Sequence, residues 1–192
     1  LGRGVDPAVA VVDAIEKRAE IGFPDPAEFV QYIENRDETR YRVECGDAAA
    51  AAAGAAIVTL PGIPMIYAGQ EIGQRGRRDA IAWDYAREGV RDRYERLLAV
   101  RAAHPALGPD GAVERVDYHV ASGDLFEQPI VVSGDVHPDD VVAFRRYTGE
   151  ESLVVVLNFA PETASVAVGA EHGDIDLVTD ESCVVADGEG TE

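Results

Sequence analysis

The sequence predicts a protein of two parts, a parallel α/β unit followed by an antiparallel β-sandwich. Helix-like and strand-like segments alternate through the first two thirds of the 192 residues, which is the order of a parallel α/β fold. After Pro109 only short strand-like segments recur, separated by turn residues, and this is typical of a sandwich. We therefore place a boundary near residues 106–112, with domains at residues 1–108 and 109–192.

The first part opens with a predicted helix and strand. Asp6-Pro7 is an N-cap followed by proline at the first helical position, and Val12 and Ile15 recur at helical spacing. Gly22 ends this helix. Residues 29–33 (Phe-Val-Gln-Tyr-Ile) are rich in aromatic and β-branched side chains and predict a short buried strand.

A second helix, a second strand and a third helix follow. Residues 47–59 contain eight alanines and predict a helix, which the glycine within them weakens. After the break at residues 60–64, residues 65–67 predict a second apolar strand that ends at Gly69. The third helix stops at Pro105. Its apolar face carries Val90, Tyr94, Leu97, Leu98 and Ala102.

The second part is predicted to contain only strands. Residues 141–144 and 153–157 indicate two strands joined by a turn at Thr148-Gly149. Residues 165–168 and 175–178 indicate two more. No helical pattern follows His104, so we expect an all-β domain.

Composition narrows the classes of function. The chain has 36 acidic and 17 basic residues and a net charge of −19, which excludes the basic surface of a nucleic-acid-binding protein and disfavours an anionic membrane surface. No apolar run approaches the ~18–20 residues of a membrane span. Lys17 is the only lysine. An acidic, lysine-poor composition is typical of halophile proteins, although codon bias in an ordinary acidic protein would give the same pattern.

The cysteines and histidines predict no metal site. Cys45 and Cys183 are far apart in the sequence, which excludes a disulfide framework and a four-ligand zinc site. Free thiols and the absence of a signal-peptide pattern favour a cytoplasmic location. His119, His137 and His172 lack metal-ligand spacing, so we expect no metal and no cofactor.

Polar segments follow both predicted strands of the first part. Residues 34–40 (Glu-Asn-Arg-Asp-Glu-Thr-Arg) come directly after the first strand, and residues 69–73 follow the second. Because functional groups collect at the carboxyl ends of parallel strands, these segments are the candidate site. Carboxylates alternating with arginines suit a polyhydroxylated ligand, but a surface ion-pair cluster has the same pattern.

These segments resemble the α-amylase family, glycoside hydrolase family thirteen. Residues 29–40 are similar to its last signature region, an apolar strand followed by Asn-His-Asp, and residues 60–73 resemble its eighth barrel strand and the following loop. The resemblance covers most of residues 20–160. Further segments are similar to the closing helix of the barrel and to strands of the sandwich that follows it: Trp83, 94–101, 104–107, 141–146 and 153–159.

The resemblance implies that residues 1–108 are the last βα units of a (β/α)8 TIM barrel and that a β-sandwich follows. A whole barrel takes about 250 residues, so six of its eight strands are expected to be missing. Family members act on α-glucosidic bonds of starch-like glucans with retention, through an Asp nucleophile and a Glu acid/base on the fourth and fifth strands. The resemblance therefore implies a C-terminal part of a glycosidase that is inactive by itself.

The resemblance also assigns the site residues. Asp37 matches the third family carboxylate, which holds hydroxyls of the reacting sugar and favours the positively charged transition state. Arg36 stands where the family usually has His, and its permanent charge can pair with Asp37 instead. Arg40 matches a position that reaches a neighbouring sugar in some members; the alternative is an ion pair with Glu38 or Glu44. Asp37 is thus the candidate catalytic residue, and Arg36 and Arg40 are candidate substrate-binding residues.

Three further polar or aromatic residues are assigned structural roles. Glu71 follows the second strand, but the family does not use this position for catalysis. Trp83 is expected to pack rather than to form a sugar platform, and Tyr67 to form a wall of the barrel mouth.

Two alternative functions stay open. The alternatives to a C-terminal part of a glycosidase are a non-catalytic α-glucan-binding module, in which the sandwich binds sugar, and the subunit of a split glycosidase, whose open barrel edge pairs with a partner chain or a second copy. The expected partners are an α-glucan or maltooligosaccharide and a completing chain, with no nucleic acid and no membrane.

Overall fold

The computed structural model describes residues 8–22, 25, 28–116, 119–120, 131–133, 136–162 and 165–166. The N-cap at Asp6-Pro7, Cys183, His172 and the strand predicted at 175–178 lie outside these residues. The first part contains helices α1 (Ala10–Glu20), α2 (Tyr41–Thr59) and α3 (Val90–Ala103), strands β1 (Val30–Gln31) and β2 (Ile63–Pro64), and short 3-10 helices η2 (Gln70–Ile72), η3 (Trp83–Tyr85) and η4 (Pro105–Leu107). No described helix has the length and apolar character needed to span a membrane.

Strands β1 and β2 form a parallel pair connected by helix α2, which confirms the predicted α/β order. The backbone N–H of Ile63 donates to the carbonyl of Phe29, just before β1, and that of Met65 donates to the carbonyl of Gln31. Between them lies Pro64, which has no N–H to give. The sequence predicts the second strand at residues 65–67, and this position is wrong. The N–H of Tyr67 is bound by Oε1 of Gln70 at 3.2 Å, so the chain leaves the strand before reaching it.

Helix α2 is interrupted at Gly46, whose φ of 86° is open to glycine because it lacks a Cβ atom. The regular helix therefore begins at Asp47, as the alanine-rich pattern predicts, and residues 41–45 form a separate first turn. Gly54 lies against helix α3. A Cβ atom there would stand 2.6 Å from the hydroxyl oxygen of Tyr94, so this glycine permits the close approach of the two helices.

The second part contains two small sheets, each of three strands among the residues described. Strands β3 (Ala112–Arg115), β6 (Val141–Tyr147) and β7 (Ser152–Asn158) form an antiparallel sheet with β6 in the centre. This confirms the predicted hairpin around Thr148-Gly149. Strands β4 (His119–Val120) and β5 (Val131–Ser133) pair in parallel, and β8 (Ser165–Val166) joins β5 antiparallel, so the other sheet is mixed rather than purely antiparallel.

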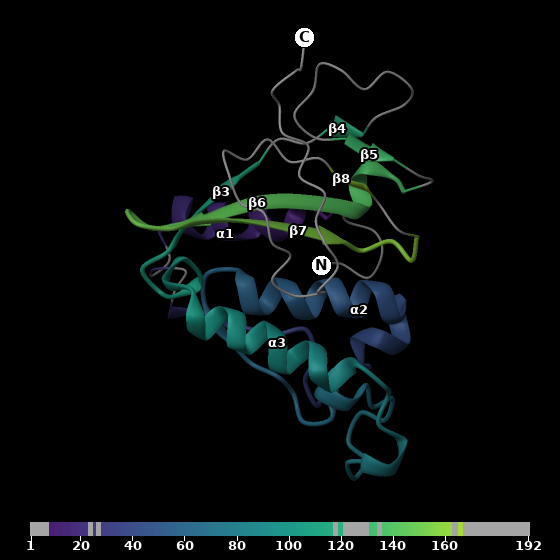
Figure 1. Ribbon diagram of the computed structural model, residues 1–192. Helices are drawn as coiled ribbons and strands as arrows, with labels where there is room; N and C mark the ends of the chain where they lie inside the picture. Colours follow the sequence, from purple (N-terminus) through teal and green to yellow (C-terminus); the bar gives the residue numbers. More distant parts are fainter. Residues whose placement is uncertain are drawn as a thin grey trace.

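The hydrophobic core runs from the helices into the antiparallel sheet. Residues Val141 to Phe144 of β6 are at most 2% exposed, so this strand is buried on both faces. Helices α2 and α3 lie on one side of strands β6 and β7 (Figure 1). Because this core crosses residues 106–112, the two predicted domains share it, and the boundary itself stays a prediction. One core cluster comprises Ala8, Val12, Ile15, Ala52, Ala56, Leu60, Val142, Phe144 and Leu157.

The buried face of helix α3 is narrower than the sequence predicts. Val90, Tyr94 and Leu97 are buried, but Leu98 is 40% exposed and Ala102 is also exposed. The helix packs mainly on α2 and η2, so one stripe of its surface suffices.

Two arginines bind backbone carbonyls at the C-terminal end of α2, where a helix leaves carbonyl groups without partners. Arg101 comes from α3 and Arg146 from β6. Arg146 is fully buried, and burial, together with the nearby Arg101, lowers its pKa to about 10. The carbonyl acceptors are Val58, Leu60 and Gly62 for Arg101, and Thr59, Gly108, Gly111 and Ala112 for Arg146.

Replacing Arg146 is expected to destabilise the protein strongly. Arg146→Met leaves several buried carbonyls without a donor, so the free energy of unfolding in urea should fall by about 3 kcal/mol. Arg145→Met is the matched control, because Arg145 has a side chain 42% exposed and an ion pair with Glu114 at the surface. That change should cost less than about 1 kcal/mol. Equal losses for both variants would contradict the role of Arg146.

Glu151 joins the turn between β6 and β7 to the end of α3. One carboxylate oxygen pairs with Nδ1 of His104 at 2.6 Å, and the other accepts the backbone N–H of Ala106 at 2.9 Å. These bonds, that of Ala106 foremost, lower the pKa of Glu151 below its ordinary value of 4.5.

Stability is therefore expected to depend on Glu151 in acid. A lowered folded pKa contributes stability above the unfolded pKa, and this contribution is lost as the pH falls through the folded value. The thermal midpoint of the parent chain should fall more steeply between about pH 6 and about pH 3 than that of Glu151→Gln. Glu150→Gln, an exposed neighbour, should follow the parent curve. Coincident curves for all three proteins would refute this role.

Candidate functional site

Asp37 lies in a tight turn within the segment that connects β1 to α2. Oδ1 of Asn35 accepts the backbone N–H groups of Asp37 at 2.7 Å and Glu38 at 3.1 Å, which fixes the turn. The Asp37 side chain is 65% exposed, and that of Arg36 is 77% exposed. Nε of Arg36 lies 3.7 Å from Oδ2 of Asp37. The two residues therefore form the ion pair that the sequence suggests, although the atoms are too far apart for a hydrogen bond.

A second arginine, from the loop after β2, binds Asp37 more closely. Nη2 of Arg78 lies 2.8 Å from Oδ1 of Asp37, and its Nε donates to the carbonyl of Arg36 at 2.8 Å. Arg77 donates to the carbonyl of Asp37 at 3.1 Å. Sequence reasoning missed both contacts, although the run Arg-Gly-Arg-Arg at residues 75–78 is a visible basic cluster in an acidic chain.

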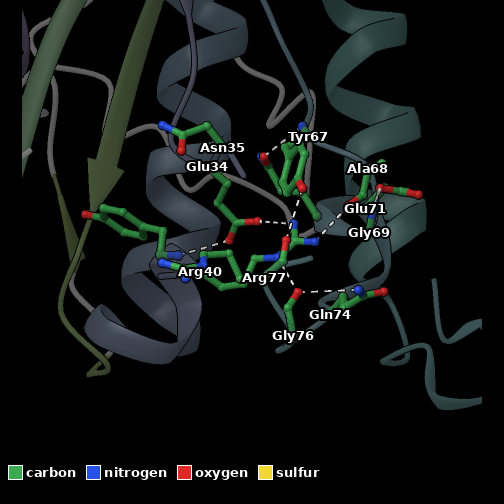
Figure 2. Close-up of polar contacts among 12 residues, drawn as sticks. Glu34, Asn35, Arg40, Tyr67, Ala68, Gly69, Glu71, Gln74, Gly76 and Arg77 are labelled. Carbon is green, nitrogen blue, oxygen red and sulfur yellow. Dashed lines mark hydrogen bonds and ion pairs between the residues drawn. The ribbon is translucent and has the colours of Figure 1, made fainter. Parts of the chain in front are cut away.

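Arg40 lies inside the protein, only 1% exposed, and holds three segments together. Its Nη1 pairs with Oε2 of Glu34 at 2.8 Å, its Nη2 donates to the carbonyl of Ala68 at 2.9 Å, and its Nε donates to the carbonyl of Gly76 at 2.8 Å. The guanidinium also lies over the ring of Tyr67, 4.4 Å from its centre. Figure 2 shows these contacts meeting between the loops that follow β1 and β2.

The structure thus gives Arg40 a different ion-pair partner from the Glu38 or Glu44 that the sequence suggests. Glu34 is itself 3% exposed, and its other oxygen accepts the backbone N–H of Tyr41 at 3.1 Å. A buried pair of this kind needs hydrogen-bond partners for its polar atoms, and here each nitrogen of the Arg40 guanidinium and each oxygen of the Glu34 carboxylate has one. A contact of Arg40 with substrate stays a prediction.

The remaining candidates divide between turn-forming and exposed residues. Oε2 of Glu71 accepts the N–H of Gly69 at 2.8 Å, a contact that fits the structural role expected for it. Tyr67 donates its hydroxyl to the carbonyl of Arg77 at 3.0 Å. Trp83, expected to pack, is instead 54% exposed.

The chemistry of the site is that of a carboxylate between arginines. The part of the chain that the structure describes holds no cluster of three or more His, Cys, Asp or Glu side chains with metal-binding geometry. Asp37 offers acceptor oxygens at the surface, and Arg36 and Arg78 offer planar donors beside it. Such a set can bind hydroxyl groups and stabilise developing positive charge.

Comparison with known proteins identifies relatives for almost the whole chain, although no family model matches it. It is 46% identical over 181 residues to the α-amylase MalA of Haloarcula japonica, a match that covers 94% of this chain and 25% of that protein. The chain therefore spans about a quarter of the length of this curated relative.

Several solved structures have a similar fold. A noncanonic maltogenic α-amylase, AmyB from Thermotoga neapolitana, matches with a TM-score of 0.64 and 16% identity over 93% of this chain and 41% of its own. An α-amylase from Lactobacillus plantarum matches with a TM-score of 0.63 and 20% identity over 91% and 38%. A debranching enzyme from Nostoc punctiforme matches with a TM-score of 0.59 and 20% identity over 79% and 29%.

Replacing Arg40 should destabilise the loops that form the candidate site, because its buried side chain connects them. Arg40→Gln leaves the Glu34 carboxylate buried without a counter-charge, so the free energy of unfolding should fall by about 3 kcal/mol. Amide hydrogen exchange should accelerate at residues 68–76, because Arg40 binds the carbonyls of Ala68 and Gly76 at the two ends of this segment. The matched control is Arg36→Gln, at an exposed position, which should change stability by less than about 0.5 kcal/mol. Unchanged exchange at residues 68–76 in Arg40→Gln would show that another contact holds these loops.

Proposed function

By sequence and by fold this chain belongs to the α-amylase family, whose C-terminal part it matches, and from this premise we propose that it forms part of a glycosidase acting on α-glucosidic bonds of starch-like glucans. Its acidic, lysine-poor composition fits a relative from Haloarcula. The similar solved structures support an α-amylase-type fold, of which the chain covers a part.

Our proposal for the architecture follows from the parallel pair of strands. Strands β1 and β2, joined by α2, have the connectivity of neighbouring barrel strands, so we assign residues 1–108 to the end of a (β/α)8 barrel and residues 109–192 to a sandwich. An exposed apolar face supports this. Val30, Tyr32 and Ile63 are each at least 50% exposed on or beside the two strands, a surface that further strands would cover.

The observation that carries the proposed site is the position of Asp37. Asp37 lies in the segment that follows β1, on the side of the strand where parallel α/β proteins place functional groups, and its carboxylate is exposed to solvent. Arg78 holds Oδ1 at 2.8 Å, whereas the one cation near Oδ2 among the described residues is Arg36, at 3.7 Å. A sugar hydroxyl can therefore donate to Oδ2 without displacing a short bond.

Each arginine has a separate role in this proposal. Arg36 supplies a hydrogen-bond donor at the surface where the sugar binds, because its side chain, at 77% exposed, is the most exposed of the three arginines. Arg78 orients the Asp37 carboxylate, and Arg40 supports the loops behind it. The charge of Asp37 would then stabilise the oxocarbenium-like transition state of a retaining reaction. We infer that the nucleophile and the acid/base come from strands other than β1 and β2.

The alternative in which the sandwich binds sugar has little support among the described residues. Sugar-binding modules present exposed aromatic rings, but Phe144 is fully buried and Phe159 packs against the core. Tyr147 is covered by the guanidinium of Arg145, 5.1 Å from the ring centre. A partner chain or a second copy that covers β1 and β2 stays open as a proposal.

The proposed site predicts sugar binding that depends on Asp37. In a titration of the 192-residue chain with maltotriose, followed by amide chemical shifts, residues 35–40 should move. Asp37→Asn should weaken this binding about tenfold, because the sugar hydroxyl loses a charged acceptor. Asp110→Asn, at an exposed position in another loop, is the matched control. Shifts confined to residues 141–168 would favour the binding module instead.

The same proposal predicts no turnover by this chain alone. A chromogenic maltooligosaccharide incubated with the rigorously purified chain in high salt should release no product above the buffer rate. Steady release that Asp37→Asn abolishes would show that the chain contains its own nucleophile and acid/base.

A further inference from the structure

A small cavity lies where helices α2 and α3 meet the segments that follow β1 and β2. Its volume is about 10 Å³, which is at the lower limit, ~10–15 Å³, for a site that holds one water molecule. A cavity of this size takes a water when its walls are polar and stays empty when they are apolar. The polar residues that line it are Glu34, Arg42, Gln70, Arg93 and Tyr94.

Tyr94 needs an acceptor for its hydroxyl proton. The residue is 8% exposed, and its hydroxyl oxygen accepts Nε2 of Gln70 at 2.7 Å. Burial raises the pKa of Tyr94 above its ordinary value of 10.0, so the hydroxyl keeps its proton and remains a donor.

Gln70 does not take this proton. Its side-chain oxygen already accepts the backbone N–H of Tyr67 at 3.2 Å, and this fixes the amide with Nε2 toward Tyr94. The hydrogen bonds among the described residues include no other contact of the Tyr94 hydroxyl. Because a buried donor without an acceptor costs stability, we expect the acceptor in the cavity beside it.

Arg42 brings further donors to the same cavity. Its side chain is 8% exposed, and burial lowers its pKa below the ordinary value of 12.5. Nη1 of Arg42 lies 3.3 Å from Oδ1 of Asp47, just beyond the usual N–H···O range of ~2.7–3.2 Å. A guanidinium presents several N–H donors in one plane, and this single ion pair cannot satisfy most of them.

The charges around the cavity favour a neutral occupant. Arg42 is balanced by Asp47, and Glu34 is balanced by Arg40 at 2.8 Å. Arg93 is exposed, so its charge is solvated. An ion would therefore lose its hydration and bring an unbalanced charge into this interior, whereas water both accepts and donates hydrogen bonds.

We propose that this cavity is a binding site for one ordered water molecule, which accepts the hydroxyl proton of Tyr94 in a hydrogen bond and donates toward Glu34. The water joins helix α3 to the buried pair of Glu34 and Arg40, which supports the loops after β1 and β2. Tyr94 and Gln70 make the parallel connection to Tyr67, whose ring lies 4.4 Å from the Arg40 guanidinium. This inference does not depend on the proposed sugar site.

The test is a crystal structure of the 192-residue chain, and the parent protein alone decides it. A water oxygen should lie ~2.5–3.0 Å from the hydroxyl oxygen of Tyr94, with a second polar atom of the cavity within hydrogen-bond distance. Crystals soaked in sodium bromide or in rubidium chloride should show no anomalous peak at this position. An empty cavity, an anomalous peak, or a water that does not reach Tyr94 would overturn the proposal.

A pair of tyrosine variants tests the role of the hydroxyl. Tyr94→Phe keeps the ring but removes one partner of the water and the acceptor of Gln70. The occupancy of the water should fall, and amide hydrogen exchange at Tyr67, whose N–H Gln70 binds, should accelerate about tenfold. Tyr85→Phe is the matched control, because Tyr85 is 84% exposed and does not line this cavity. It should change neither measurement. A water of equal occupancy in Tyr94→Phe and the parent would also overturn the proposal.

Discussion

Buried arginines that must find acceptors for their N–H groups are the constraint on which this structure depends. A guanidinium keeps its charge and presents its donors in a rigid plane, so each buried one fixes the groups around it. Arg40 and Arg146 are at most 1% exposed, and most of their acceptors are backbone carbonyls of turns. The turns are held in place because any other conformation would leave a buried charge unsatisfied.

Each of these arginines joins parts of the chain that are far apart in sequence. Arg146 connects β6 to the end of α2, and Arg101 connects α3 to the same end, so the helices and the antiparallel sheet close on one core. Arg40 connects the segment after β1 to the two turns after β2. In the same two loops, Asp37 stands between Arg36 and Arg78. A lysine, with one compact charge, could not bind three acceptors in this geometry.

The candidate site shows which contacts can be predicted from the sequence and which cannot. The position of Asp37 and its pairing with Arg36 were predictable, because both residues follow a recognisable strand and are neighbours in the chain. The Arg78 contact was not, since Arg78 and Asp37 are 41 residues apart and their meeting depends on how two loops face each other. The exposure of Trp83 was equally hidden, because a large apolar side chain predicts burial unless the neighbours that would cover it are known.

By itself the sequence determined the order and type of the elements: the parallel α/β arrangement, the regular helix from Asp47, the hairpin of β6 and β7, and the likeness to the α-amylase family. These follow from periodicity and turn chemistry, which act over a few residues. Only the tertiary structure decided that β2 ends before residues 65–67, that Arg40 pairs with Glu34, and that one core crosses the predicted boundary. Those outcomes depend on which distant donors and acceptors meet when water is excluded, and no local pattern records that.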